Sequence, residues 1–111
     1  MSSDTPTPTP AAQVDLLAAT VETFAPVVGQ TFEAIFTDGR LPLTLAEVIL
    51  LGQPREAGLR APFSLQFHGR AGLRLSQRIY RLENPAVGAM EIFLVQIGDG
   101  ADGSKFEAIF N

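Results

Sequence analysis

Apolar residues recur at every second position through most of the chain beyond residue 30. In the segment QTFEAIF, Phe32, Ala34 and Phe36 alternate with Thr31, Glu33 and Ile35. Successive side chains of an extended strand point to opposite faces, so the first three residues share one buried face. This period restricts most of the chain to β-strands with one face in a core, because a helix needs apolar residues at steps of three and four.

Five further segments have the composition of strands, and Gly, Pro, Asn or Asp residues separate them. Thr37 to Arg40 provide the first turn, and REAGLR at 55–60 forms a loop. These strands are residues 41–51, apolar on both faces and therefore interior, 61–69, 76–84, 88–98 and 105–110, where FEAIF occurs a second time. About six strands in one small domain predict a mainly β fold, a compact antiparallel barrel or sandwich. We expect the first and last strands to lie near each other and to help close the sheet.

The residues before this β-rich region predict two different elements. Residues 1–10 alternate Thr and Pro at their end and indicate an extended arm, because proline lacks a backbone donor. Val14, Leu17, Val21 and Phe24 then recur at helical spacing, which predicts a helix over about 11–24 that Pro26 and Gly29 end. Residues 11–111 are expected to form a single β-rich domain with this helix at its N-terminal side.

Phenylalanine supplies most of the apolar mass of the predicted core. The chain has eight Phe, one Tyr and no Trp or Cys, so neither a disulfide nor a thiolate metal site is possible. Burial of one Phe side chain stabilises a fold by roughly 1.5–3 kcal/mol. Seven phenylalanines are predicted to be in the core: Phe32, Phe36, Phe63, Phe67, Phe93, Phe106 and Phe110.

The sequence contains no motif that indicates catalysis or a cofactor. IGDGADGSKF at 97–106 has Asp99 and Asp102 but lacks the alternating oxygen ligands of a calcium loop, and its Asp and Gly residues favour a hairpin turn. His68 is the single histidine and falls on the outward face of its strand, as does Ser64. No motif in the sequence supplies His68 with a nucleophile and an orienting acid. We therefore expect a non-enzymatic protein without metal or cofactor.

The charge balance argues against two classes of partner. The net charge of −4 and the pI near 4.8 disfavour nucleic acid and anionic membranes, because like charges repel at long range. No apolar stretch is long enough to cross a bilayer, and the first ten residues lack the pattern of a cleavable signal peptide. Synthesis in the cytoplasm is expected, followed by a place in a virion or a surface appendage if the protein is exported.

Surface residues of two kinds are candidates for contact with another protein. Arg70 and Arg74 lie on the connection between two strands, and arginine is enriched at interfaces. Ile35 and Ile109 occupy the outward positions of the two FEAIF copies, and Phe24 ends the predicted helix stripe. The predicted interface therefore consists of Phe24, Ile35, Arg70, Arg74 and Ile109, for a protein partner or for self-association into an oligomer.

Three sequence patterns resemble a known family. They are F-x-P-x-V-G-x-x-F at 24–32, P-F-S-L-x-F at 62–67 and Q-x-x-Y-x-L-E-N-P-x-x-G-x-x-x-I-F-L-V-x-I-G at 77–98. Over about residues 14–111 the chain is similar to a family of uncharacterised small bacterial β domains, which are often encoded beside fibre proteins resembling phage tail collars. The resemblance implies a structural or accessory role in a phage-tail-like or fibre-like assembly, with a fibre or tail component as partner.

Two alternatives to a permanent structural part stay open. A transient chaperone of fibre assembly would use the same contacts and then leave the particle. A carbohydrate-binding or other ligand-binding β module would instead present a pocket to a small molecule.

Overall fold

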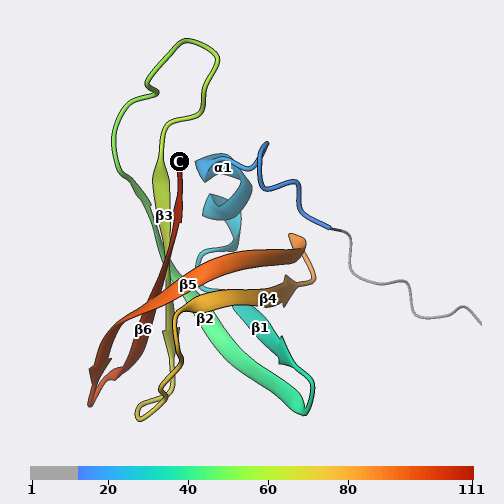
Figure 1. The fold of residues 1–111 in the computed structure, drawn as a ribbon, viewed down its shortest axis with the longest axis vertical. Coiled ribbons are helices and arrows are strands. Elements are labelled where there is room, and N and C mark those ends of the chain that lie inside the picture. Colours follow the sequence, from blue (N-terminus) through green and yellow to red (C-terminus); the bar gives the residue numbers. More distant parts are fainter. Residues whose placement is uncertain (1–12) are drawn as a thin grey trace, which may run out of the picture.

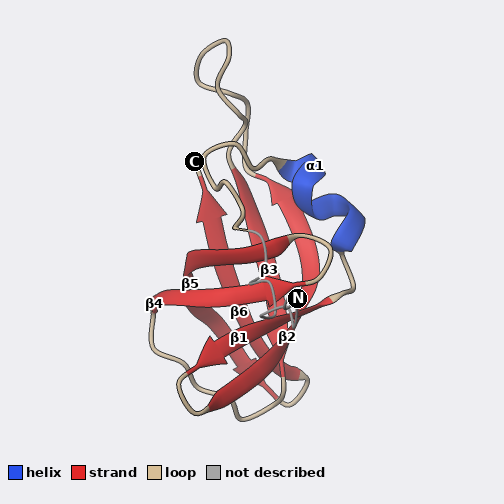
Figure 2. Cartoon of the chain, turned by 90° about the vertical axis from the view of Figure 1, so that its right-hand side faces the viewer, coloured by secondary structure: helices blue, strands red, loops and turns tan. Residues whose placement is uncertain are grey.

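The computed structural model describes residues 13–111, and the Thr/Pro arm predicted for 1–10 lies outside this range. The main elements are a short helix and six strands (Figures 1 and 2). The helix α1 spans Val21–Phe24 and continues as the 3-10 helix η1, Ala25–Val27. The strands are β1 Thr31–Phe36, β2 Gly39–Leu50, β3 Phe63–Gly69, β4 Arg78–Asn84, β5 Gly88–Gly100 and β6 Gly103–Phe110. The prediction of a mainly β, antiparallel fold of six strands is confirmed.

The six strands form a closed barrel in the order β1-β2-β3-β6-β5-β4, and β4 pairs with β1 to close it. The prediction that the first and last strands are neighbours is wrong, because β1 and β6 are separated by two strands in either direction around the ring. The connection from β3 to β4 carries the chain across one end of the barrel. As a result β4 reaches β1, and β6 fills the place beside β3.

The barrel interior is filled mainly by phenylalanine and leucine. Phe63 and Phe110 stack with ring centroids 4.6 Å apart, and Phe32 meets Phe67 edge-on at 5.5 Å. Phe36 is half-buried against Tyr80. The prediction of seven core phenylalanines fails at Phe93, which is 51% exposed because Ile92 and Leu94 take the inward positions of β5. Fully or almost fully buried are Phe24, Phe32, Phe63, Phe67, Phe106 and Phe110.

The helix is much shorter than the predicted 11–24. Val14 donates its backbone N–H to the oxygen of Ala89 on β5, so this residue pairs with the sheet instead of a helical turn. The Asp15 carboxylate accepts a hydrogen bond from the N–H of Leu17, a local bond that competes with helix formation. Leu17, predicted to lie on the buried stripe, is 90% exposed.

The loop that raised the question of calcium is a hairpin. β5 ends at Gly100 and β6 begins at Gly103, with Gly100 and Gly103 paired across the turn. Asp99 forms an ion pair with Arg74, with 2.7 Å between carboxylate and guanidinium. No group of three or more His, Asp or Glu side chains within residues 13–111 is arranged to hold a metal ion. Within the same range no helix has the length and hydropathy needed to cross a bilayer.

Candidate functional site

Strand β5 changes its partner halfway along its length. Its first half, Gly88–Leu94, pairs with β4, and from Val95 onward it pairs with β6. Strand β6 in turn pairs with β5 only up to Glu107, while its last residues, Ala108–Phe110, pair with β3 alone among the described residues. The two strands therefore separate at one end of the barrel and leave two strand edges that face each other.

A corresponding opening on the other side of β5 is filled by side-chain hydrogen bonds. The Gln96 amide accepts from the N–H of Leu75 at 2.9 Å and donates to the oxygen of Leu73 at 2.8 Å. The buried Ser104 hydroxyl donates to the same oxygen of Leu73 at 3.0 Å. These bonds take the place of a neighbouring strand on the side of β5 away from β6. The first half of β5 has no such substitute on its groove side beyond Ala89.

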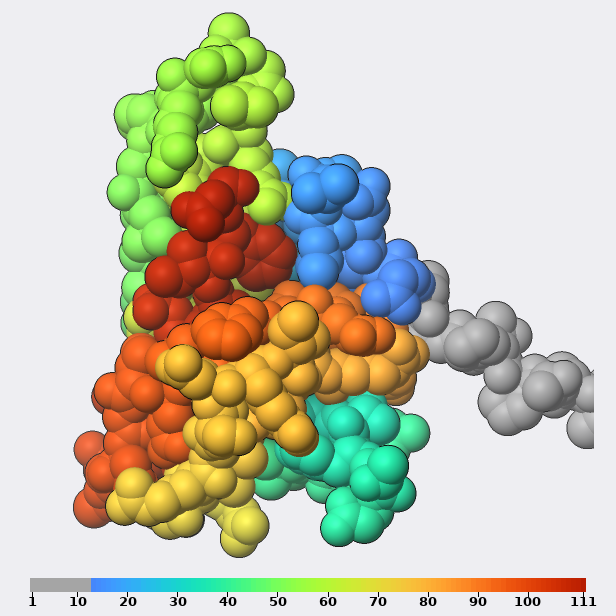
Figure 3. Space-filling model, viewed as in Figure 1, coloured from blue at the N-terminus to red at the C-terminus, as the bar shows by residue number. Residues whose placement is uncertain are grey.

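The opening between β5 and β6 forms a groove, which we call the β5/β6 groove. It has a volume of about 200 Å³ and lies between Glu91–Phe93 and Ala108–Asn111, with Leu16, Leu17 and Arg60 at one side. Figure 3 shows β5, the end of β6 and the N-terminal segment meeting on one face of the molecule.

Apolar side chains surround this groove. Leu17, Phe93 and Ile109 are exposed to 90%, 51% and 57%. Ile79 is 63% exposed and lies directly opposite Phe93 on the neighbouring strand β4. Single exposed apolar residues are common on protein surfaces, but several on adjacent elements form a patch typical of interaction sites.

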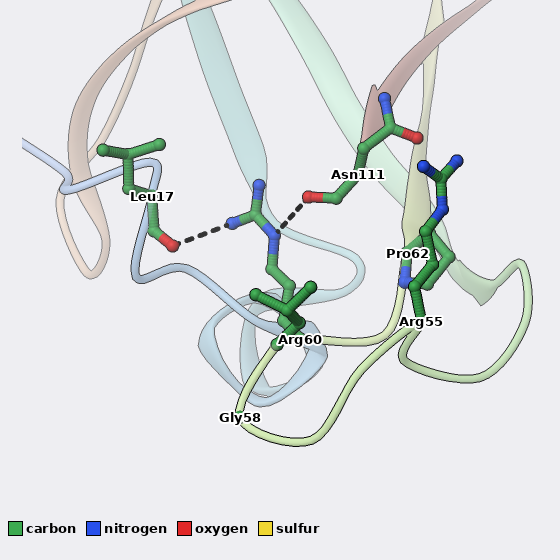
Figure 4. A pocket seen from close by; sticks show the side chains of 7 residues that line it. Leu17, Arg55, Gly58, Arg60, Pro62 and Asn111 are labelled. Carbon is green, nitrogen blue, oxygen red and sulfur yellow. Dashed lines mark hydrogen bonds between the residues drawn. The ribbon is translucent and has the colours of Figure 1, made fainter.

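Arg60 holds the N-terminal segment against the barrel beside the groove. Its Nη1 donates to the backbone oxygens of Leu16 and Ala19, and its Nε donates to the backbone oxygen of Asn111 at 2.9 Å. Its guanidinium also lies 5.4 Å from the centroid of the Phe110 ring. One planar group thereby connects residues 16–19, the start of β3 and the end of β6 (Figure 4).

A second hollow of about 370 Å³ adjoins the groove and shares Leu17, Arg60 and Asn111 with it. Leu17, Leu59, Pro62 and Arg55 line it. Figure 4 shows Leu17 on one side of Arg60 and Arg55 and Pro62 on the other. Leu59 and Arg55 belong to the loop between β2 and β3, which projects beyond the barrel (Figures 1 and 2). Both hollows thus open at the same end of the molecule.

The five residues predicted as an interface do not form one surface. Phe24 is fully buried against Phe63 and Phe110, so its side chain belongs to the core and has no surface to offer another chain. Ile109 lies at the β5/β6 groove, and Ile35 is half-buried on β1.

The two arginines of the predicted interface lie elsewhere. Arg70 and Arg74 are exposed on the β3–β4 connection, at the end of the barrel opposite the projecting loop (Figure 1). Arg74 is paired with Asp99.

Two polar residues of β3 differ from each other in exposure. His68 is exposed, as predicted, whereas Ser64 is fully buried although its side chain points outward. The prediction that Ser64 is a surface residue is wrong: its side chain is fully buried, and its hydroxyl donates a hydrogen bond to the Glu107 carboxylate on β6 at 2.8 Å. Glu107 was visible in the sequence, but the pairing of β3 with β6, which sets Glu107 opposite Gln66 and diagonal to Ser64, was not.

Sequence reasoning missed Arg60 and Phe93. Arg60 was placed in a loop, and its only signal is its position between Leu59 and the apolar start of β3. Phe93 was assigned to the core because both faces of β5 are apolar in sequence.

Residues 19–110 match the family described as Domain of unknown function, DUF6916. The chain belongs to this family. The DUF6916 region contains all six strands, α1 and both edges of the β5/β6 groove, whereas Leu16 and Leu17 precede it. No curated protein and no solved structure matched the chain.

Proposed function

We propose that this DUF6916 protein is a non-enzymatic structural or accessory component of a phage-tail-like or fibre-like assembly. It acts through protein–protein contacts at the β5/β6 groove, and its partner is a fibre or tail component or a second copy of itself. The resemblance of the sequence to domains encoded beside tail-collar-like fibre proteins supports the kind of assembly. After synthesis in the cytoplasm, the protein would become part of a virion or a surface appendage.

One observation carries the proposal: within residues 13–111, the β5 edge beyond Ala89 and the β6 edge at Ala108–Phe110 have no partner strand in the groove, and both lie beside an exposed apolar patch. Main-chain groups of a free edge can pair with an added strand, which gives affinity, and apolar pockets beside it give selectivity. Phe93 and Ile79 together with Ile109 place large apolar groups where a docked chain would cover them. Such groups contribute most of the binding free energy in many interfaces.

The test is a double substitution at the groove, Phe93→Ser with Ile109→Ser. Both side chains point outward, so the barrel should remain folded, which thermal unfolding by circular dichroism checks. We expect the wild-type chain to co-elute with the co-expressed fibre or tail protein of its host in size exclusion with light scattering. The double variant should bind at least about tenfold more weakly, because loss of a hot-spot residue costs about 2 kcal/mol or more.

Ile97→Ser is the matched control. Like Ile109, Ile97 is an exposed isoleucine, at 46%, and like Phe93 it belongs to β5. It lies in the half of β5 that is paired with β6, toward the hairpin. If the control and the double variant bind the fibre protein equally well, the β5/β6 groove is not the contact surface.

A further inference from the structure

The free edge of β6 is suited to one added strand. Ala108, Ile109 and Phe110 pair with β3 on one side and with no strand among residues 13–111 on the other. In a strand, backbone N–H and C=O groups point alternately to its two sides, so part of them face the β5/β6 groove. An extended segment that enters the groove can bond to these groups.

The sequence of residues 5–10, Thr-Pro-Thr-Pro-Thr-Pro, has an unusual pattern of backbone donors. Successive N–H groups of an extended chain point to opposite sides, and proline has none. All the threonine N–H groups can therefore face one side, while the other side has no donor at all. Such a segment can pair with one strand edge but cannot serve as template for a further strand.

The direction of the chain at Gln13 decides which groove residues 5–10 can reach. Gln13 forms a parallel bridge with Ala89, so the chain enters at the β4–β5 turn and runs toward the groove, not away from it. The residues before Gln13 would have to reverse direction to reach the groove of their own barrel. Only residues 11 and 12 separate Pro10 from Gln13, and this stretch spans about 10 Å when extended, so the groove that residues 5–10 enter must belong to a second copy lying close to the β4–β5 turn.

We propose that residues 5–10 of one copy bind the free edge of β6 in a second copy. Threonine N–H groups donate to those backbone oxygens of Ala108–Phe110 that face the groove, and the proline rings lie against Phe93 and Ile109. Exchange in both directions gives a dimer with two identical contacts, as twofold symmetry requires. The inference rests on the proposed function, since it names the occupant of the same groove.

The test compares the mass of the full chain with that of a chain lacking residues 2–10, by size exclusion with light scattering over a range of concentrations. We expect the full chain to have twice its monomer mass and the shortened chain to be monomeric. A synthetic peptide of residues 1–12, added in excess, should dissociate the full-length dimer.

Two single substitutions distinguish backbone pairing of residues 5–10 from an effect of the length of this segment alone. Thr7→Pro removes the central donor and should weaken the dimer at least tenfold, whereas Pro8→Ala keeps every threonine donor and should retain it. Equal masses for the full and shortened chains would overturn the inference, as would equal effects of the two substitutions. A monomeric full chain whose Ile109 amide resonance shifts on shortening would also overturn it, because residues 5–10 would then occupy their own groove.

Failure of this inference is distinguishable from failure of the proposed function. If shortening leaves the mass unchanged while Phe93→Ser with Ile109→Ser still abolishes binding of the fibre protein, the groove is a contact surface with a different occupant. If the double substitution affects neither, the groove is no contact surface and both proposals fail.

Discussion

Arg60 connects parts of the chain that are more than forty residues apart in sequence. A guanidinium is suited to this position because its planar fork offers five donors in fixed directions: Nη1 donates to the backbone oxygens of Leu16 and Ala19, and Nε donates to that of Asn111. The aromatic rings of Phe63 and Phe110 lie within 6 Å of its charged centre, which adds a cation–π contribution.

Arg60→Lys is expected to lower the free energy of unfolding by about 1.5–3 kcal/mol, the range measured for hydrogen bonds to charged groups. A lysine ammonium keeps the charge but cannot reach Asn111 and residues 16–19 in one geometry. Arg55→Lys in the same hollow is the control, and it should change stability by no more than about 0.5 kcal/mol. Urea denaturation measures both, and equal losses would show that the Arg60 hydrogen bonds contribute nothing to stability.

At the level of the elements, the turn between β5 and β6 depends on one glycine. Gly103 has φ of 125°, and a Cβ atom there would lie 2.6 Å from the backbone oxygen of Gly69. Both the backbone angle and the contact exclude a side chain, since neither backbone segment can move without disturbing the β3–β6 pairing.

Gly103→Ala is therefore expected to destabilise the barrel by about 2 kcal/mol or more. Gly100→Ala is the matched control across the same turn, because a Cβ atom at Gly100 has no neighbour within 4 Å. Thermal unfolding compares the two variants. A loss at Gly103 no larger than that at Gly100 would mean that the hairpin relaxes around the added methyl group.

The elements also show what could be predicted from the sequence. Strands β1, β3 and β6 were found because one face is apolar and the other is not. The same rule failed for Phe93. Because Ile92, Phe93 and Leu94 are consecutive apolar residues, alternation does not show which of them point into the barrel. The helix was overestimated because spacing alone does not reveal that Val14 pairs with Ala89. Strand order, and with it the β5/β6 groove, depends on pairings between distant segments that local patterns do not encode.

In the whole molecule, the barrel is closed by its shortest pairing. β1 and β4 share three residue pairs, and one of them places Glu33 directly opposite Glu83. Like charges facing each other across two strands are destabilising. Arg40 lies between them, with its Nη1 2.9 Å from Glu33 and 3.9 Å from Glu83. Arg81 also pairs with Glu83 at 2.8 Å, so the closure has cations for both carboxylates.

Arg40→Gln should reveal the repulsion between Glu33 and Glu83 and lower the free energy of unfolding by about 0.5–1 kcal/mol, a small value because these groups are partly exposed. Adding Glu33→Gln to this variant removes the repulsion and should recover most of the loss. The difference should also shrink in 1 M NaCl, where charges are screened within about 3 Å. Urea denaturation at both salt concentrations measures these changes. A loss that persists in the double variant and in high salt would mean that Arg40 stabilises the closure through the packing of its aliphatic stem and not through its charge.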